Sequence, residues 1–520
     1  MHVRPSARLP YSTSRVFQVF HASRVFRASF SSFPSPASPA SPASLASPAS
    51  RTSRTSRTSS ASLATSTSAL GLCLAVLLLA PGPVQAGGDF DWLLARQRSL
   101  AEEGRLTASD ALQTAPALNG AEFVIGSTRA LPMPRAAMGA AGNGVGTGAR
   151  VGYTLVDRPD GVRLHLGAAV HRVPGRDRYG HGLPETSLEG FELSVPLGPG
   201  RVYASQQRRH WGPAWMGSLI LDGAAAPVAA LGWRKDDDQP FATRWLNWLG
   251  PWSADFFGGR LSGQHEPRHP WLIGMRVTAQ PLTGLQIGLS RTIQWGGSGR
   301  DESWSSFWRA LRGNDNVGDS GVTKGNEPGN QMAGYDIRYA HALGARHVLA
   351  GYAQAIGEDE RNHKPYKFLL TVGLELSGRF SAASTAPWRG YQWRVFGEWS
   401  DTGMRHAFGT HQPGAYRHAA FAGGYANYRQ PLGFPSGGDV TLGSLGAIVD
   451  GPGASLIAVL HSGHALRGAQ MFEAGDSIRG LSLGAQMPWR GWRLGASLDM
   501  VRASSMHRQQ AGQLWAAWDW

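Results

Sequence analysis

The segment His265-Glu266-Pro267-Arg268-His269 has the spelling of the H-E-x-x-H zinc motif. In that motif both histidines bind the metal from one face of a helix, one turn apart. Pro267 stands inside the segment and Pro270 follows it, and a proline in a helix interior removes a hydrogen bond and clashes with the preceding turn. Strand-like sequence flanks the segment on both sides. We therefore interpret it as a polar loop between strands and predict no metal site.

Two groups of carboxylates could supply the acid and the base of a glycosidase. They are Glu358, Asp359 and Glu360, and the pair Glu398 and Asp401. Such a dyad is defined by the distance between its carboxyl groups, and carboxylates on the polar face of a strand are ordinarily solvated or paired with arginine. A G-x-S-x-G nucleophile elbow does not occur, because Gly296-Gly297-Ser298-Gly299 ends in Arg300. We predict no catalysis and no cofactor.

Two clusters combine indole rings with planar cations, which suits saccharide contact. A pyranose offers an apolar C–H face, and arginine can grip the carboxylates of an acidic polymer in bidentate fashion. We predict polysaccharide binding by Arg208, Arg209, His210, Trp211 and Trp215 in the first cluster and by Trp304, Trp308 and Arg309 in the second, which also contains Phe307 and Arg312. Packing in a loop or in an aromatic girdle explains the same residue types equally well. The prediction therefore names a region and not a defined pocket.

Strands dominate the chain after about residue 149. In Trp271–Thr278 every second residue is apolar, and Leu285–Trp295 repeats the pattern, with Leu285, Ile287, Leu289 and Ile293 on one side. This period of two is typical of a strand with one apolar and one polar face. Comparable runs occupy 162–170, 335–343, 368–376, 391–399 and 492–500. Helices do not intervene, so the sequence predicts an all-β fold.

A soluble sandwich or propeller and a membrane barrel both fit this pattern, and three features favour the barrel. The apolar faces of several predicted strands end in a tryptophan, as is typical of the aromatic girdles at membrane interfaces; these are Trp271, Trp295, Trp492 and Trp520. Tight turns also alternate with long polar loops such as 296–331. The chain also alternates to its last residue, and the terminal Trp520 resembles the ending that the barrel-insertion machinery reads. We predict a closed antiparallel transmembrane β-barrel over residues 121–520.

The first 86 residues predict export. Residues 1–60 are low-complexity, the apolar run 69–80 has the length of a signal-peptide core, and Val84-Gln85-Ala86 ends in the small residue that signal peptidase needs. We predict cleavage after Ala86, so that 1–86 is a low-complexity extension plus a signal peptide. The only cysteine, Cys73, lies in this part, and the mature chain would hold no disulfide and no thiol ligand.

A short helical element is expected at 87–120. Asp91–Ala101 groups Leu93, Leu94, Gln97, Leu100 and Ala101 on one helical face, and Gly104 is placed to end the helix. Thr107 and Asp110 predict the start of a second short helix. A frayed linker helix is the other interpretation of so short a pattern.

The charge balance excludes a nucleic-acid-binding class. The formal net charge is +14, but residues 1–86 carry eight arginines and no acidic residue. Without residues 1–86 the chain has 42 basic and 36 acidic residues, which gives a net charge of +6. Such a mildly basic chain suits an acidic polymer and carries no nucleic-acid signature.

Several ordered segments resemble the motifs of the Wzi family of capsule-assembly proteins. They are 210–227 (HWGPAWMGSLILDGAAAP), 245–252 (WLNWLGPW), 269–281, 329–341, 357–368, 396–403 and 416–433. The resemblance covers roughly residues 88–520. It implies about eighteen strands, a small helical bundle at the periplasmic mouth of the barrel, and a lectin-like, non-catalytic outer-membrane protein that attaches or organises capsular polysaccharide in a Gram-negative cell surface.

Two other functions remain open at this point. An outer-membrane porin or sugar-specific channel would have an open lumen, whereas a tethering protein would have an interior obstructed by folded loops. An outer-membrane enzyme would need a converging nucleophile, base and orienting group. The partners expected are capsular or extracellular polysaccharide, outer-membrane lipid and the insertion machinery.

Overall fold

The computed structural model describes residues 88–103, 118–127, 145–172, 186–235, 237, 239–262, 267–313, 322, 327–361, 364–380, 389–406, 409–428 and 430–520. The predicted signal peptide and its cleavage site, the second helix expected near 107–110, and His265 and Glu266 lie outside these residues. The helix expected at 91–101 is confirmed as α2 (Gly88–Glu103). None of the described helices is both long enough and apolar enough to cross a membrane.

Antiparallel strands make up most of the described chain. The remaining helices are η2 (Asn247–Leu249), a short 3-10 helix, and α4 (Trp304–Arg312). The strands are β1 (Gly120–Ser127), β2 (Val145–Asp157), β3 (Arg163–Arg172), β4 (Thr186–Ser187), β5 (Glu192–Leu197), β6 (Gly200–Ser205), β7 (Ala230–Lys235), β8 (Trp252–Arg260), β9 (Trp271–Leu282), β10 (Leu285–Trp295), β11 (Gly329–Leu343), β12 (His347–Arg361), β13 (Lys364–Arg379), β14 (Gln392–Arg405), β15 (His411–Gln412), β16 (Ala426–Asn427), β17 (Gln430–Pro431), β18 (Val440–Asp450), β19 (Ser455–Ala465), β20 (Ser477–Trp489), β21 (Trp492–Ala503) and β22 (Met506–Asp519).

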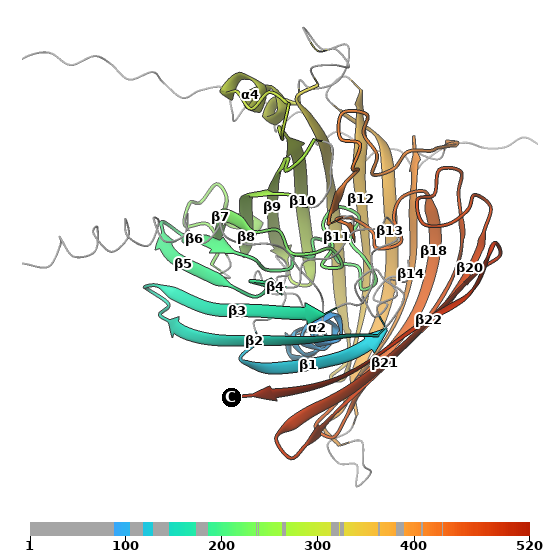
Figure 1. Ribbon diagram of the computed structural model, residues 1–520. Helices are drawn as coiled ribbons and strands as arrows, with labels where there is room; N and C mark the ends of the chain where they lie inside the picture. Colours follow the sequence, from blue (N-terminus) through green and yellow to red (C-terminus); the bar gives the residue numbers. More distant parts are fainter. Residues whose placement is uncertain are drawn as a thin grey trace, which may run out of the picture. The chain divides into compact units, whose positions relative to one another are not determined.

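The strands close into a ring (Figure 1). The first strand, β1, pairs with β2 on one side and with the last strand, β22, on the other, so that Phe123 lies opposite both Ala149 and Ala516. Eighteen of the described strands follow one another around the ring, and the two-residue strands β4 and β15 add short pairings to it. The predicted closed antiparallel barrel and its strand number are confirmed.

The two ends of the barrel differ in their connections. At one end, tight turns join β9 to β10, β11 to β12, β18 to β19 and β20 to β21, and the C-terminal residues lie at this short-turn end. At the other end, long connections join β6 to β7, β10 to β11 and β14 to β18. Outer-membrane barrels carry short turns on the periplasmic side and longer loops outside. We therefore infer that the long-loop end faces the cell exterior.

The alternation predicted from the sequence separates an outer apolar face from an inner polar one. On β9, Arg276 and Thr278 are buried inside the ring, whereas Val277 between them is exposed on the outer face. Apart from their first residues at 162 and 391, the runs predicted at 162–170, 335–343, 368–376, 391–399 and 492–500 fall in strands, namely β3, β11, β13, β14 and β21. The outer face is the one that lipid contacts, since every second residue along a barrel strand faces outward.

Aromatic residues gather at both ends of the outer face. Trp271 begins β9 and pairs with Trp295 at the end of β10, at the long-loop end. At the short-turn end, the ring of Trp518 lies 5.9 Å from that of Trp492 and 6.0 Å from that of Trp520. These positions match the interfacial girdles expected of a barrel.

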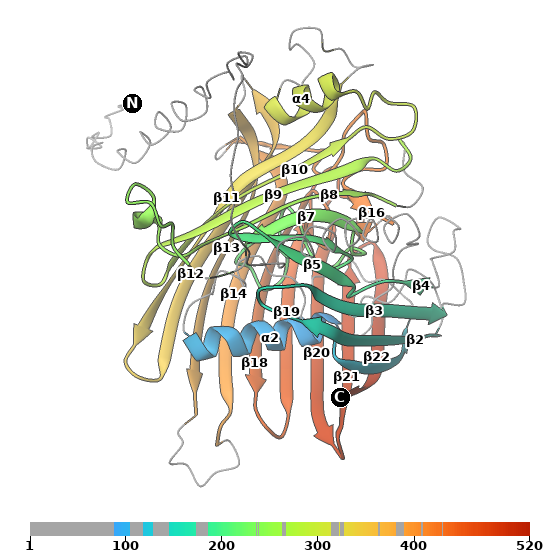
Figure 2. The same ribbon diagram turned by 90° about the vertical axis from the view of Figure 1, so that its left-hand side faces the viewer.

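The segment 296–331, predicted as a long polar loop, contains a helix that the sequence analysis did not identify. The structure has α4 there, beside the end of β10 (Figure 2). Arg291, which β10 directs outward, donates to the carbonyl oxygens of Ala310 and Leu311 at distances of 3.1 and 2.8 Å. Because α4 covers this part of the outer wall, Ile293 is fully buried although its register points it outward.

Candidate functional site

The connection between β6 and β7 fills the lumen. Residues 206–229, which we call the plug, combine apolar and small residues, and every position from 206 to 228 is buried. Leu219, Ile220 and Leu221 belong to the main apolar cluster of the interior, together with Tyr416 and Phe434 from the connection between β14 and β18. The lumen of the described barrel is therefore obstructed by folded chain.

Carboxylates on two wall strands hold the centre of the plug. The indole N–H of Trp215 donates to Glu375 on β13, and its backbone N–H donates to Glu398 on β14. The backbone N–H of Met216 donates to the second oxygen of Glu398 at 3.0 Å. The Trp215 ring also stacks on Phe396 of β14, with ring centroids 5.6 Å apart. The plug is thus fixed by both hydrogen bonds and ring packing.

Arginines balance the charge of Glu375. Glu375 forms ion pairs with Arg338 on β11 and, at 3.0 Å, with Arg394 on β14. Arg394 in turn donates to the side-chain oxygen of Gln97 on α2 at 2.6 Å. A buried charge is tolerated only when it is paired and hydrogen-bonded. Because Glu375 also accepts from Trp215 and Arg394 donates to Gln97, this network connects the wall to the plug and to α2.

The first four residues of the first predicted cluster lie near the start of the plug. Arg209 sits 3.4 Å from Asp255 on β8 and packs over the ring of Phe257, and Arg208 donates to Glu189 at 2.8 Å. His210 shares a hydrogen bond of 2.8 Å with Asp222, which lies further along the plug. Trp211 packs edge-on against Phe257, with centroids 5.6 Å apart.

Two elements cover the plug from opposite ends. From the short-turn side, α2 lies inside the ring (Figure 1), where Arg96 donates to the carbonyl oxygen of Ala214 at 2.9 Å and Trp92 packs on His210. Asp450, at the short-turn end of β18, binds Arg98 at 2.7 Å. From the long-loop side, the hydroxyl groups of Tyr416 and Tyr425 donate to the carbonyl oxygens of Leu219 and Ile220.

All five residues of the first predicted cluster are therefore interior residues. Arg208, Arg209, His210, Trp211 and Trp215 are each less than a tenth exposed, and their side chains contact the wall, α2 or the plug itself. A polymer outside the barrel reaches none of them while the plug keeps this position. In this conformation they act as packing residues, and polysaccharide contact by them stays a prediction.

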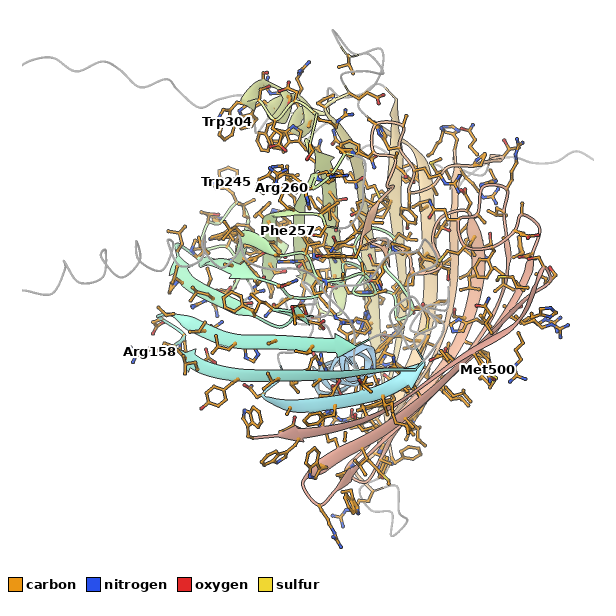
Figure 3. The ribbon with its side chains drawn as sticks, in the orientation of Figure 1. Arg158, Trp245, Phe257, Arg260, Trp304 and Met500 are labelled. Atoms are coloured by element: carbon orange, nitrogen blue, oxygen red, sulfur yellow. The ribbon has the colours of Figure 1, made fainter. Side chains whose placement is uncertain are left out.

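The second predicted cluster has the opposite environment. Helix α4 is capped at its start by Ser303, whose hydroxyl oxygen accepts the backbone N–H of Ser306, and at its end by Gly313, which adopts a left-handed conformation. Trp304 is 77% exposed and lies at the rim (Figure 3), and Trp308 is 49% exposed, whereas Arg309 is partly buried. The ring of Phe307 packs edge-on against Trp295, Trp304 and Trp308.

Charged residues fix the start of α4 to the wall. Arg260, at the end of β8, donates two hydrogen bonds of 2.7 and 3.0 Å to the carboxylate of Glu302 and packs over the ring of Trp271. This hydrogen bonding lowers the pKa of Glu302. The backbone N–H of Ser303 donates to Asp301 and lowers the pKa of that carboxyl group. Both carboxylates are therefore ionised at neutral pH.

Two of the carboxylates considered for catalysis, Glu398 and Asp401, have structural contacts. Glu398 accepts from the backbone of the plug and from the hydroxyl group of Tyr352 at 2.6 Å, and Asp401 pairs with Arg405 at 2.7 Å. The side chains of Asp359 and Glu360 lie outside the described part of the chain. Sequence reasoning missed the roles of Glu375 and Arg96 in holding the plug, although alternation had already put Glu375 on the polar face of its strand.

These features define the class of the protein. A closed barrel with an apolar outer face, aromatic ends and an interior filled by its own chain is an integral outer-membrane β-barrel with a plugged lumen. The family model for the capsule assembly protein Wzi matches residues 194–506, which is more than half of the chain. The chain belongs to this family, and the resemblance noted in the sequence is confirmed.

Individual relatives agree with the family assignment. A Klebsiella pneumoniae protein described as an uncharacterized 55.8 kDa protein in the cps region is 36% identical over 165 residues, which is 32% of each chain. The match thus spans about a third of that relative's length. Wzi of Escherichia coli, described as a carbohydrate-binding β-barrel involved in group 1 capsule assembly, has a solved structure that is 22% identical and has a TM-score of 0.61 over 84% of this chain and 89% of that chain. At this identity the similarity shows the fold alone.

Proposed function

We propose that this protein attaches or organises capsular polysaccharide at the bacterial cell surface and that it catalyses no reaction. The observation that carries the proposal is the pairing of an obstructed lumen with an exposed aromatic and cationic helix at the long-loop end. The family is named for capsule assembly, and the Escherichia coli relative is described as carbohydrate-binding. Both descriptions support the proposal for this chain.

The chemistry of α4 suits a polysaccharide. The two exposed indoles, Trp304 and Trp308, offer flat apolar faces for the C–H face of a pyranose, and Arg309 can bind a carboxylate in bidentate fashion. All three side chains lie on a helix that is fixed to the wall by Arg291 and by the Arg260–Glu302 pair. A preorganised helix loses less conformational entropy on binding than a free loop does.

The proposal that the protein catalyses no reaction draws on how two candidate carboxylates, Glu398 and Asp401, are used. Glu398 and Asp401 are engaged in contacts that hold the plug and a strand end, which leaves neither poised as an acid beside a water-filled substrate site. The further expectations are contact with outer-membrane lipid, insertion through the terminal Trp520, a signal peptide that ends at Ala86, and a periplasmic position for the helical element 87–120.

A diffusion porin or sugar channel is the competing function, and the plug argues against it. A planar-bilayer recording separates the two. The tethering function predicts no stable single-channel conductance for the wild type. It predicts conductance for a variant in which residues 212–222 are replaced by a short glycine-serine linker. A wild-type protein that conducts as well as this variant would favour the porin.

The experiment that tests the proposal scores polysaccharide on cells. Deleting the gene in its own host should move capsular polysaccharide from the cell-bound to the released fraction, and wild-type protein should restore it. A Trp304→Ala/Trp308→Ala variant should restore it poorly. The matched control is Trp489→Ala, which removes an exposed tryptophan at the opposite end of the barrel and should restore it fully. Unchanged retention in the deletion strain would refute the proposal.

A further inference from the structure

The connection between β7 and β8 exposes large apolar side chains at the short-turn end. Within this tryptophan loop (residues 239–251), Trp245 is 88% exposed and Trp248 is 68% exposed, and Leu246 between them is also exposed. Among the exposed large apolar side chains of the described residues, Trp245 has the highest exposed fraction. Neither the barrel wall nor the proposed polysaccharide site accounts for these residues.

The tryptophan loop is held in a defined conformation. The ring of Phe241 stacks on that of Trp252, with centroids 4.2 Å apart and planes 3° apart. Lys235 packs over the same Trp252 ring and donates to the carbonyl oxygen of Gln239 at 3.0 Å. The turn itself is closed by a hydrogen bond of 3.0 Å from the backbone N–H of Asn247 to Thr243. The exposure of the indoles is therefore a property of a fixed loop.

The loop continues the lipid-facing surface of the wall. It returns to the barrel at Trp252, which pairs with Ala279 near the short-turn end of β9, and Gln280 donates to the carbonyl oxygen of Pro251 at 2.9 Å. Phe256 on β8 and Leu282 on β9 are exposed on the outer face beside it. Figure 3 shows Trp245 on the same side of the barrel as Trp304, which lies at the long-loop end.

We propose that the tryptophan loop is a membrane anchor that lies in the phospholipid headgroup layer of the periplasmic leaflet. An indole combines an apolar body with an N–H donor, so tryptophan is enriched where hydrocarbon meets water. The neighbouring Arg244 is exposed and suits lipid phosphates. Continuity with the lipid-facing wall favours lipid over a soluble partner. The inference does not depend on the polysaccharide-binding function.

The test places a probe in the loop. The chain carrying Asn247→Cys is labelled with a nitrobenzoxadiazole fluorophore and reconstituted into nanodiscs of phosphatidylethanolamine and phosphatidylglycerol. We expect nitroxides on the lipid headgroups to quench at least half of the emission and aqueous iodide to quench little of it. Thr243→Cys, at a second exposed position of the loop, gives an independent measurement if the first variant does not fold.

Asp160→Cys is the matched control. It lies in the exposed turn between β2 and β3, at the same end of the barrel, and should be quenched by iodide and hardly by headgroup nitroxides. Wild-type protein taken through the labelling reports any signal from Cys73. If the probe in the tryptophan loop behaves like the probe at position 160, the loop lies in water and the proposal is wrong.

Discussion

The plug and α4 use the same kinds of residue in opposite environments. Trp211 and Trp215 are completely buried inside the barrel, whereas Trp304 and Trp308 are exposed on its rim. Both pairs stand beside arginines in the sequence, and both look equally suited to bind a saccharide. The difference shows that a tryptophan-arginine cluster does not define a binding surface until the partners of each side chain are known.

The partners explain why the two regions differ. Inside the barrel, the wall carboxylates Glu375 and Glu398 accept hydrogen bonds from the plug, and Arg338 and Arg394 neutralise Glu375. Arg309 of α4 approaches Asp301 only to 3.8 Å, and 36% of the Arg309 side chain and 57% of the Asp301 side chain are exposed, so this pair adds little to stability. The buried cluster therefore contributes to folding, and the exposed cluster stays available for a ligand.

We expect the largest effect from a substitution in the buried cluster. Trp215→Ala removes a fully buried ring that stacks on Phe396, together with the hydrogen bond to Glu375, and should lower the free energy of unfolding by about 3–5 kcal/mol. A urea titration of the protein folded in lipid vesicles measures this change. Trp304→Ala is the control and should change it by less than about 0.5 kcal/mol. Equal losses for the two variants would contradict the comparison.

We expect a smaller effect from substitutions in the exposed cluster on α4. Trp304→Ala/Trp308→Ala should weaken the binding of purified protein to its host's polysaccharide by about tenfold, or about 1.4 kcal/mol, because the stacking surfaces are lost. Isothermal titration calorimetry measures the dissociation constant. Trp245→Ala/Trp248→Ala should leave it unchanged. If both double variants bind as wild type does, α4 is not the binding surface.

A third variant weakens α4 without touching its exposed rings. Ser303→Ala removes the side-chain cap of the helix and should cost about 1 kcal/mol of local helix stability. Hydrogen exchange of the amides in 304–312 should become faster, while exchange in the plug should not change. Ser298→Ala, in the same connection but outside the cap, serves as the control. An effect of equal size there would show that the connection as a whole was disturbed.

The wall of the barrel could be predicted from sequence because its physics is local. A period of two separates Val277 from Arg276 and Thr278 whatever the strands pair with, and the terminal aromatic marks the last strand. The helix α4 was missed for a different reason. Its signals, a serine N-cap at Ser303 and a glycine after Arg312, are present, but the nine-residue helix lies within a longer segment that had been interpreted as a loop.

The position of the plug inside the barrel could not be predicted, because it depends on contacts between residues far apart in the sequence. The hydrogen bond from Trp215 to Glu375 joins positions 160 residues apart, and that from Arg394 to Gln97 joins positions 297 apart. Alternation shows that Glu375 faces inward but does not show which chain segment it meets. The sequence therefore identified residues with the right chemistry and could not divide them into interior and exposed groups.

We expect the smallest effect from a change of pH at α4. Glu302 and Asp301 have lowered pKa values, so their stabilising contacts with Arg260 and Ser303 are fully present above the ordinary carboxyl range of about 4 and are lost as the pH falls through the lowered values. The fluorescence anisotropy of a probe at Arg312→Cys should therefore stay constant from pH 7 to about pH 5 and fall in more acidic solution. Adding Arg260→Gln removes the main cause of the shift in Glu302, so part of the fall should move to higher pH. A transition that does not move with this variant would mean that the Arg260–Glu302 pair does not hold α4 to the wall.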